Sequence, residues 1–499
     1  MTPTPSNTPG IPLRELLRNA DFYGAENILV SACCGDSRVC SPGDLFVAMM
    51  GPHQDGHDFV AEAVANGATA ILAERLLPMA GVPVVVVPDA RWAYGRICQA
   101  LAGDPSHSLK VIGVSGTNGK TSVACLIAAM LEAAGDAVGM LNSLGYCDGR
   151  EFEPSLWPTP PPPVLAHWLA RMRDNGCSYA IVEVSSEALL HGTLAGVELN
   201  SACLTNVRRG DLAAHGSITN YQAAKARLFE HLAKDGAAIL NIDDPVVEGL
   251  LVNLRNPTLT VSLHEDAEIT ATLLERSRSE QTFLLSAGSD STPVRTSIVG
   301  DSHITNCLLA AAIGLAYGLD LPTVVRGLEG VKKIPSRLER IECGQPFGVF
   351  VDEAATPDRL ANALITLREV TPGRLICVAS LGYECQPSEQ LEMSRAVEKM
   401  ANVVIATGEL TRDPAMRGNL ARLLRGFSTP QTVQIVADRE LAIRWALNEA
   451  QPGDCVLITG DRRGIGRMFA GADSDTSDRH IAQQWLYDRG SLLGTRMAS

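Results

Sequence analysis

Short apolar runs alternate with longer amphipathic segments along most of the chain, which is the pattern of strands and helices in an α/β protein. In the first hundred residues, apolar runs at 45–48, 70–72 and 84–87 predict buried strands, and residues 59–66 predict a helix between the first two. The segment Gly-Asp-Pro-Ser-His-Ser at 103–108 contains mostly residues that interrupt periodic structure, and it predicts a linker after this region.

A second region repeats the alternation. It begins with an apolar strand at 109–114, a glycine-rich turn and a helix at 121–134. Further buried strands are predicted by the apolar runs 180–184, 201–205 and 237–241, with helices between them. Such a succession indicates a parallel sheet covered by helices on both faces. Five prolines among residues 158–163 predict a loop at that point.

A third region begins near residue 334 and has the same character. Its strand candidates are 348–352, 374–378, 403–406, 433–436 and 455–458, separated by helical patterns such as 357–370 and 439–450. This succession predicts a second doubly wound unit. Since a domain averages about 150 residues, the 499-residue chain is interpreted as three α/β domains, 1–108, 109–334 and 335–499.

Composition narrows the class of protein. Lys and Arg number 42 against 56 Asp and Glu, and the net charge of −14 argues against a general nucleic-acid or anionic-membrane binder. The 13 cysteines include no C-x-x-C pair, which predicts small core residues in a reducing cytoplasm and not a disulfide framework. The N-terminus lacks a signal-peptide pattern, and the longest apolar stretch, 307–319, is too short to cross a bilayer. We therefore expect a soluble, cytoplasmic protein.

The strongest chemical signal is the segment Ser-Gly-Thr-Asn-Gly-Lys-Thr at 115–121, between a predicted strand and a predicted helix. Glycines let backbone N–H groups curl around a phosphate, and the helix N-terminus directs positive charge at the same anion. In such a loop Lys120 contacts the β- and γ-phosphates, and the Thr121 hydroxyl can bind Mg²⁺. Because Val114 stands where the strict motif has its first glycine, the alternative is a tight glycine turn without a ligand.

Two further residues suit a phosphate site. Glu183 lies near the end of the predicted strand 180–184, and the carboxyl end of a parallel strand faces the ligand crevice, where Mg²⁺ needs hard oxygen ligands. Tyr221 and Lys225 are four residues apart in a helical run and therefore share one face. The alternatives are a solvated carboxylate at Glu183 and an ordinary exposed lysine at Lys225.

The run Gly-Thr-Asn-Gly-Lys-Thr at 116–121 is similar to the nucleotide-binding signature of the Mur ligases, ATP-dependent enzymes that form amide bonds in peptidoglycan precursor synthesis. The rest of the chain resembles the UDP-N-acetylmuramoyl-tripeptide synthetase branch, on motifs such as Asp-Ser-Arg at 36–38 and Tyr-Gln-Ala-Ala-Lys at 221–225. The resemblance implies a central P-loop parallel-sheet ATPase domain, an N-terminal α/β UDP-binding domain and a C-terminal Rossmann-like, amino-acid-binding domain.

The resemblance also implies roles for individual residues around ATP. Asn306 would read adenine, Asp352 would accept a hydrogen bond from the ribose, and Arg337 would contact the γ-phosphate. The whole implied ATP set is Gly116, Thr117, Asn118, Gly119, Lys120, Thr121, Ser122, Asn306, Arg337 and Asp352. The alternative for Asn306, Arg337 and Asp352 is a packing or solvated role.

Metal, catalytic and substrate roles follow from the same resemblance. Mg²⁺ would be held by Thr121, Glu183 and a Lys225 carbamylated by CO₂, with Asp211 in place of a family histidine. Lys120, Lys225 and Arg337 would be catalytic. The implied substrate residues are Ser37 at the uridine end, with an Asp-Ser turn and a buried strand as the alternative, and Thr159, Ser185 and Arg412.

The chain departs from the family pattern at several motifs. The replaced segments are Ser-Ser-Glu at 185–187 for Ser-Ser-His, Thr193 for a substrate-binding arginine, Ser336 for a glycine, Asp-Glu-Ala-Ala-Thr-Pro-Asp at 352–358 for Asp-Tyr-Ala-His-Thr-Pro-Asp, Glu-Leu-Thr-Arg at 409–412 for Asp-Asn-Pro-Arg, and Gly-Asp-Arg-Arg-Gly at 460–464 for Gly-Lys-Gly-His-Glu. The ATP and Mg²⁺ residues are mostly retained, whereas the pocket for the incoming amino acid is chemically rewritten. Arg412 could still bind a carboxylate.

The leading hypothesis is therefore an ATP- and Mg²⁺-dependent ligase that adds a diaminopimelate- or lysine-like amino acid to UDP-N-acetylmuramoyl-L-alanyl-D-glutamate. Its partners would be that uridine-linked dipeptide and a free amino acid, without nucleic acid or membrane insertion, and the protein would be a monomer. A catalytically weakened paralogue that binds nucleotide or precursor is the alternative. A ligase with another acceptor, as in folylpolyglutamate synthase, is disfavoured by the 108-residue N-terminal region, since that branch begins close to its phosphate loop.

Overall fold

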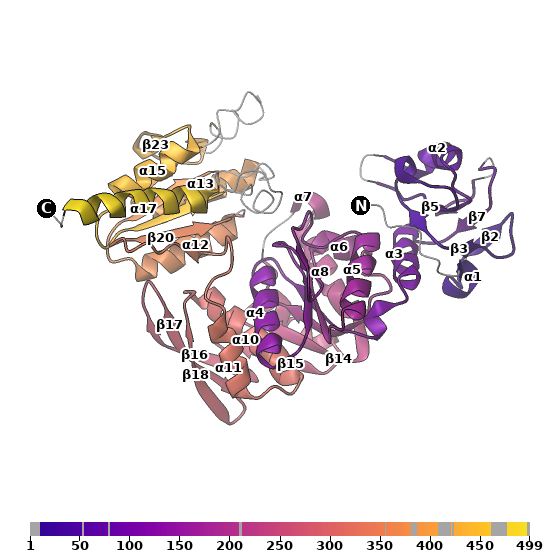
Figure 1. Ribbon diagram of the computed structural model, residues 1–499, viewed down its shortest axis with the longest axis horizontal. Coiled ribbons are helices and arrows are strands. Elements are labelled where there is room, and N and C mark those ends of the chain that lie inside the picture. The colour runs from indigo at the N-terminus through magenta and orange to yellow at the C-terminus, as the bar shows by residue number, and fades with distance from the viewer. Residues whose placement is uncertain are drawn as a thin grey trace.

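The polypeptide forms three bodies, each built on its own main sheet. The central body lies between the N-terminal and the C-terminal body (Figure 1). The computed structural model describes residues 10–51, 54–77, 80–208, 212–354, 356–380, 387–407, 421, 424–460 and 477–496. The separate sheets confirm the predicted α/β fold class with three main sheets. The domain boundaries at 108 and 334 stay predictions.

The N-terminal body carries a five-stranded sheet in the order β2–β7–β6–β5–β4, in which all neighbours after β7 are parallel. Its strands are β2 Asp21–Tyr23, β4 Cys33–Cys34, β5 Leu45–Val47, β6 Ala70–Ala73 and β7 Val84–Val86, and its helices are α1 Leu13–Leu16, α2 Val60–Ala65 and α3 Ala90–Leu101. A small two-stranded sheet pairs β1 Ile11–Pro12 with β3 Leu29–Val30. The three predicted strands and the predicted helix of this region are confirmed.

The central sheet has 11 strands in the order β11–β10–β9–β12–β8–β13–β14–β15–β16–β17–β18. In this spatial order, all neighbours from β9 to β16 are parallel. The antiparallel strands β10 and β11 extend the sheet at one end, and β17 and β18 extend it at the other. The strands are β8 Lys110–Ser115, β9 Val138–Leu141, β10 Tyr146–Cys147, β11 Phe152–Glu153, β12 Tyr179–Glu183, β13 Leu199–Leu204, β14 Leu232–Asn241, β15 Thr258–Ser262, β16 Ile269–Arg276, β17 Gln281–Ala287 and β18 Asp290–Thr296.

Helices cover both faces of this sheet (Figure 1). On β8, Ile112 and Val114 pack into the core formed with α4, α10 and α11, whereas Val111 packs into the opposite core with α5. Burial on both faces explains why these strands are continuously apolar. The helices of the central body are α4 Lys120–Ala133, α5 Pro162–Asp174, α6 Ser186–Leu190, α7 Leu212–His215, α8 Ile218–Ala226, α9 Pro245–Glu248, α10 Asp301–Ala316 and α11 Leu321–Gly330.

The C-terminal body has a six-stranded sheet in the order β19–β20–β24–β21–β22–β23, parallel except for the edge strand β19. Its strands are β19 Glu339–Arg340, β20 Gly348–Asp352, β21 Leu375–Ala379, β22 Val403–Ala406, β23 Gln434–Ile435 and β24 Cys455–Thr459, and its helices include α12 Pro357–Val370, α13 Pro387–Met400, α15 Arg439–Glu449 and α17 Asp478–Arg496. One core contains residues of α12 and α13 and the other contains residues of α15 and α17, as a doubly wound unit requires.

Three features differ from the sequence-based expectations. The loop predicted at 158–163 ends early, because α5 begins at Pro162, and prolines are tolerated in the first turn of a helix, where the missing N–H has no partner. The meander of β16, β17 and β18 was not predicted. Cys34 and Cys40 form a disulfide, so the expectation of unpaired cysteines is wrong for this pair. Among the described residues, every helix is too short or too polar to cross a membrane.

Candidate functional site

The glycine-rich turn between β8 and α4 adopts a conformation that depends on its glycines. Gly116 has φ of 145° and Gly119 has φ of 87°. A Cβ atom on Gly116 would lie 1.9 Å from Oγ1 of Thr205, and one on Gly119 would lie 2.5 Å from Oδ1 of Asn306. The turn is therefore held against two neighbouring segments, and it presents the N-terminus of the 14-residue helix α4 to the space in front of it.

Two lysines converge on the base of this turn. Nζ of Lys120 donates to the carbonyl oxygens of Gly116 and Thr117, each at 3.1 Å. Nζ of Lys225, from α8, donates to the same Gly116 oxygen at 2.7 Å, and Lys225 is only 2% exposed. Because both amines contact one oxygen, they lie within 2.7 + 3.1 = 5.8 Å of each other. The alternative of an exposed Lys225 is thus wrong, and the structure brings it to the phosphate loop.

Hydroxyl and carboxylate oxygens gather at the start of α4. Oγ1 of Thr121 donates to Oε2 of Glu183 at 2.9 Å and lies 2.9 Å from Oγ of Ser143. The backbone N–H of Ser143 donates to the same carboxylate oxygen at 3.1 Å. Glu183 is 2% exposed at the end of β12, so the alternative of a solvated carboxylate is wrong.

Arg337 reaches this cluster from the connection between α11 and β19. Its Nη2 donates to Oγ1 of Thr121 at 3.3 Å and to Oγ of Ser143 at 3.2 Å, while its Nη1 donates to the carboxylate of Glu353. Burial lowers the pKa of Arg337, but Glu353 and the neighbouring carboxylates Asp352 and Glu183 raise it more, so that the net pKa lies above its ordinary value. Ser336, where the family has glycine, has φ of 56°, a region that favours glycine.

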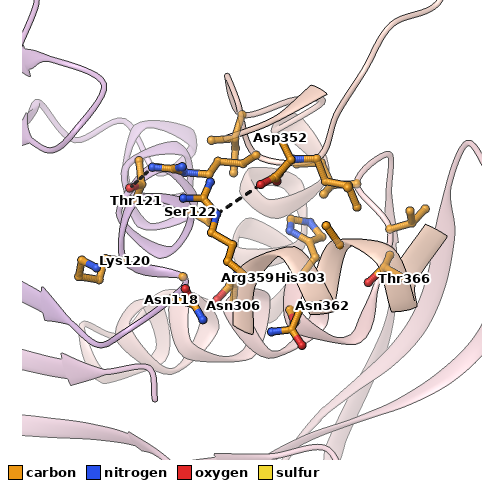
Figure 2. Close-up of a pocket in the computed structure, with 18 of the residues that line it drawn as sticks. Asn118, Lys120, Thr121, Ser122, His303, Asn306, Asp352, Arg359, Asn362 and Thr366 are labelled. Carbon is orange, nitrogen blue, oxygen red and sulfur yellow. Dashed lines mark hydrogen bonds and ion pairs between the residues drawn. The ribbon is translucent and has the colours of Figure 1, made fainter. Parts of the chain in front are cut away.

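Lys120, Thr121, Glu183 and Arg337 line one open pocket, whose empty volume of about 850 Å³ includes solvent space at its mouth. One wall is the central helix α10, with His303 and Asn306, and the opposite wall is α12 of the C-terminal body, with Arg359 and Asn362 (Figure 2). Burial lowers the pKa of His303 to about 4, so the His303 side chain on α10 is uncharged at neutral pH.

Asp352 and its neighbours join the pocket to the C-terminal body. Asp352 lies at the end of β20 and accepts hydrogen bonds from the backbone N–H groups of Leu338 at 2.6 Å and Ala354 at 2.7 Å. Nε of Arg359 lies 3.4 Å from Oδ1 of Asp352 (Figure 2). Burial lowers the pKa of Arg359, and the charge of Arg337 lowers it further.

The phosphate loop itself also touches the C-terminal body. Nδ2 of Asn118 donates to Oδ2 of Asp358 at 2.6 Å, and burial raises the pKa of that aspartate. Asn206, which follows β13, accepts two hydrogen bonds from the loop. Its Oδ1 accepts from the backbone N–H of Asn118 at 2.9 Å, and its backbone carbonyl accepts from the backbone N–H of Thr117 at 2.9 Å. The N–H groups of Thr117 and Asn118 are thus engaged within the protein, and a loop fixed from both sides can present the N–H groups at the start of α4 to an anion with little rearrangement.

The donor set at the head of α4 fits a hard divalent cation. The Thr121 hydroxyl and the Glu183 carboxylate are oxygen ligands of the kind Mg²⁺ prefers, and their 2.9 Å separation allows both to contact one ion. Ser143 adds a third oxygen at the same point. The Thr121, Ser143 and Glu183 oxygens would therefore suit a magnesium ion.

The remaining predicted residues lie in different places. Oγ1 of Thr159 donates to the Glu183 carbonyl and accepts from the backbone N–H of Ser185, each at 2.8 Å, so both residues lie directly behind the carboxylate. Ser37 lies in the N-terminal body, 5% exposed, and its hydroxyl donates to Glu62 at 2.5 Å. Asp211 and Arg412 lie outside the described residues.

The structure thus gathers one set of predicted residues around a single pocket: Thr117, Asn118, Gly119, Lys120, Thr121, Ser122, Glu183, Asn306, Arg337 and Asp352. Sequence reasoning missed Ser143, Arg359 and Asn362. The signal for Ser143 was available, because it follows a parallel strand adjacent to β12, at the edge where ligands bind. Arg359 and Asn362 are brought to α10 only by the packing of two domains.

Comparison with known proteins adds a family context. Three family models match: the Mur ligase middle domain over residues 114–314, the Mur ligase glutamate ligase domain over 336–462, and the Mur ligase family catalytic domain over 30–100. A UDP-N-acetylmuramoyl-L-alanyl-D-glutamate–2,6-diaminopimelate ligase of Geobacillus thermodenitrificans is 35% identical over 91% of this chain and 94% of its own. The ligase of the same name from Syntrophomonas wolfei is 33% identical over 95% of this chain and 99% of its own.

Solved structures agree. A structure of a UDP-N-acetylmuramoyl-L-alanyl-D-glutamate–2,6-diaminopimelate ligase has a TM-score of 0.69 at 26% identity, covering 96% of this chain and 99% of that one. The MurF ligase of Thermotoga maritima, solved in complex with ADP, has a TM-score of 0.62 at 18% identity, covering 92% and 98%, a likeness of fold.

Proposed function

The chain belongs to the Mur ligase family of ATP-dependent, amide-bond-forming enzymes, and we propose that it joins an amino acid to UDP-N-acetylmuramoyl-L-alanyl-D-glutamate. The observation that carries the proposal is the convergence of Lys120, the Thr121–Glu183 pair and Arg337 at one end of one pocket. That end is where a P-loop holds the terminal phosphates of a nucleotide.

In the proposed reaction the substrate carboxylate attacks the γ-phosphorus of ATP in line, the bond to the leaving ADP oxygen breaks, and an acyl-phosphate forms. An amine then attacks the acyl carbon, an amide bond forms, phosphate leaves and the amine loses a proton. Lys120 and Arg337 stabilise the charge on the transferring group's equatorial oxygens. A bound Mg²⁺ would neutralise phosphate charge, held by Thr121 and Glu183.

Lys225 is proposed to carry a carbamate, which converts a buried cation into an anion beside the metal. Its amine lies within 5.8 Å of Nζ of Lys120, from the contact lengths of 2.7 and 3.1 Å to one oxygen. A neighbouring cation and burial both favour the neutral amine that reacts with CO₂. We expect Lys225→Ala to abolish turnover and a short carboxylic acid to restore part of it. Lys234→Ala, an exposed lysine on β14, is the control. Full activity of purified Lys225→Ala would exclude the carbamate.

The added amino acid is proposed to be diaminopimelate- or lysine-like, with Arg412 binding a carboxylate. The support is the name of the relatives and the retained arginine, while the glutamate that holds the incoming side-chain amine in the family is absent from 460–464. The test measures phosphate release from ATP with the uridine-linked dipeptide and a panel of amino acids, and identifies the product by mass spectrometry.

Lys120→Ala is expected to lower kcat by on the order of 100-fold or more, since it removes a charged donor to the transition state. Phosphate release that depends on both the dipeptide and one amino acid, with the matching mass increase, would establish the activity. Nucleotide binding without product for any amino acid would favour instead a weakened paralogue, which the rewritten motifs at 185–187 and 460–464 already suggest.

A further inference from the structure

Arg337 is held between two different environments. One nitrogen, Nη1, donates to the carboxylate of Glu353, and the other, Nη2, donates to the hydroxyls of Thr121 at 3.3 Å and Ser143 at 3.2 Å. The side chains of Arg337 and Glu353 are only 16% and 13% exposed. The carboxylate therefore holds one edge of the guanidinium, and the Nη2 edge is directed at Thr121, the residue whose hydroxyl binds Mg²⁺ in a P-loop.

Glu353 is itself firmly placed. Oε2 of Glu353 also accepts from Nη1 of Arg359 at 3.1 Å, and its backbone N–H donates to the Ser336 carbonyl at 3.2 Å. The second guanidinium is in turn fixed, because Nη2 of Arg359 donates to the same Ser336 carbonyl at 3.2 Å. The carboxylate thus bridges two buried arginines and cannot swing without breaking both contacts. A bridge of this kind fixes orientation through charge-assisted hydrogen bonds.

A carboxylate next to a polyphosphate site has two possible consequences of opposite sign. As a simple counter-charge it would repel the nucleotide, so removing its charge would strengthen the binding of di- and triphosphates. As an anchor for Arg337 it would pre-organise a cation at the γ-phosphate, so removing its charge would weaken triphosphate binding selectively. The two contacts that fix the carboxylate, and the direction of the Nη2 edge of Arg337 toward Thr121, favour the anchor.

We propose that Glu353 is a positioning residue that holds Arg337 at the γ-phosphate end of the pocket and thereby makes the site prefer a nucleoside triphosphate to a diphosphate. The residue stands where the family pattern has tyrosine, so the device is a property of this chain. The inference rests on the proposed function only in requiring that the pocket binds adenine nucleotides, and it requires no amide product.

The test is calorimetric titration of the full-length protein with ADP and with adenylyl imidodiphosphate, a non-hydrolysable ATP analogue, both with Mg²⁺. For Glu353→Gln we expect the analogue to bind about tenfold more weakly, as for a lost hydrogen bond to a charged group, and ADP to bind within about twofold of wild type, because ADP lacks the γ-phosphate at which the proposal places Arg337. Arg337→Ala should lower the preference for the analogue at least as much. In an Arg337→Ala background, Glu353→Gln should have no further effect on that preference.

Glu449→Gln is the matched control, because Glu449 also binds an arginine of the C-terminal body, Arg374 at 3.2 Å, away from the pocket. Equal weakening of both nucleotides, tighter binding, unchanged binding, or a further loss in the Arg337→Ala background would each overturn the proposal. If Glu353→Gln fails to fold, Glu353→Asp keeps the charge on a shorter arm and must show a smaller loss of the same selective kind. A wild-type protein that binds neither nucleotide would refute the proposed function, whereas normal binding with unchanged preference in the variants would refute this inference alone.

Discussion

Replacing Gly116 by alanine is expected to disrupt the phosphate loop by a measurable amount. The new Cβ would lie 1.9 Å from Oγ1 of Thr205, far inside van der Waals contact, so the loop or the end of β13 must move. The positive φ of 145° adds backbone strain of about 1–3 kcal/mol, and overpacking adds roughly 1–3 kcal/mol. We expect a total destabilisation of roughly 2–6 kcal/mol and a loss of ADP affinity, because the backbone N–H groups that would surround the phosphate shift.

The two contributions can be separated with a matched glycine. Gly135 follows α4 in the same body, with φ of 94° and open space around its would-be Cβ, so Gly135→Ala measures backbone strain alone, about 1–2 kcal/mol. The Thr205→Ala background removes the clashing hydroxyl. In that background, the loss of unfolding free energy caused by Gly116→Ala should fall toward the loss caused by Gly135→Ala. A Thr205→Ala single variant costs about 1 kcal/mol, for its hydrogen bond to the Asn118 carbonyl.

Urea unfolding of the full chain provides the measurement. A three-domain protein unfolds in steps, so the relevant transition is the one that added ADP shifts to higher urea. Gly116→Ala should lower that midpoint more than Gly135→Ala does. If the two variants destabilise the central body equally, or if Thr205→Ala does not relieve Gly116→Ala, the close approach of β13 to the loop is not what fixes its conformation.

Three other perturbations have defined outcomes. Glu183→Gln should lower kcat by on the order of 100-fold while leaving ADP binding in EDTA unchanged; equal ADP affinity with and without Mg²⁺ in the wild type would contradict this. The pKa of His303 is lowered to about 4 from 6.5, so the unfolded chain takes up the proton first on acidification. The free energy of unfolding should therefore fall by roughly 3 kcal/mol as the pH is lowered from about 6.5 to about 4. In His303→Leu this decrease should be absent, so the curve of unfolding free energy against pH should be flatter in that range. Asp478→Ala removes the ion pair that Arg439 makes at 2.7 Å in a mostly buried place and should cost more than ~1 kcal/mol, whereas Glu440→Ala, which breaks an exposed pair, should cost ~1 kcal/mol or less.

The retained and rewritten parts of the site lie on different domains. The residues that suit phosphate and metal, Lys120, Thr121 and Glu183, come from the central body, where the sequence keeps the family pattern. The altered segment 352–358 lies on the C-terminal body and supplies Glu353, which now binds Arg337. A change of substrate with retention of the ATP-driven chemistry would have this distribution, and the amino-acid panel tests it directly.

Local sequence was sufficient for the elements and for the phosphate loop. The run Gly-Thr-Asn-Gly-Lys-Thr needs only neighbouring residues to form its turn, and Glu183 could be placed at the binding edge because parallel strands share that edge. Strands such as β20 and helices such as α12 were predicted to within a residue, since their periodicity is strong. The meander of β16 to β18 was not predicted. The prolines at 162 and 163 were assigned to a loop, although proline is also tolerated in the first turn of a helix, which is where α5 places them.

The pocket as a whole was decided only by tertiary structure. Arg359 and Asn362 contribute to it because α12 packs across the central body, more than 200 residues from the loop in sequence, as the Asn118–Asp358 contact illustrates. The Glu353–Arg337 contact likewise depends on how β20 leaves its sheet beside residue 336. Periodicity and motif spacing describe interactions among neighbours in the chain, whereas contacts between residues far apart in the sequence depend on distances that only the packed chain defines.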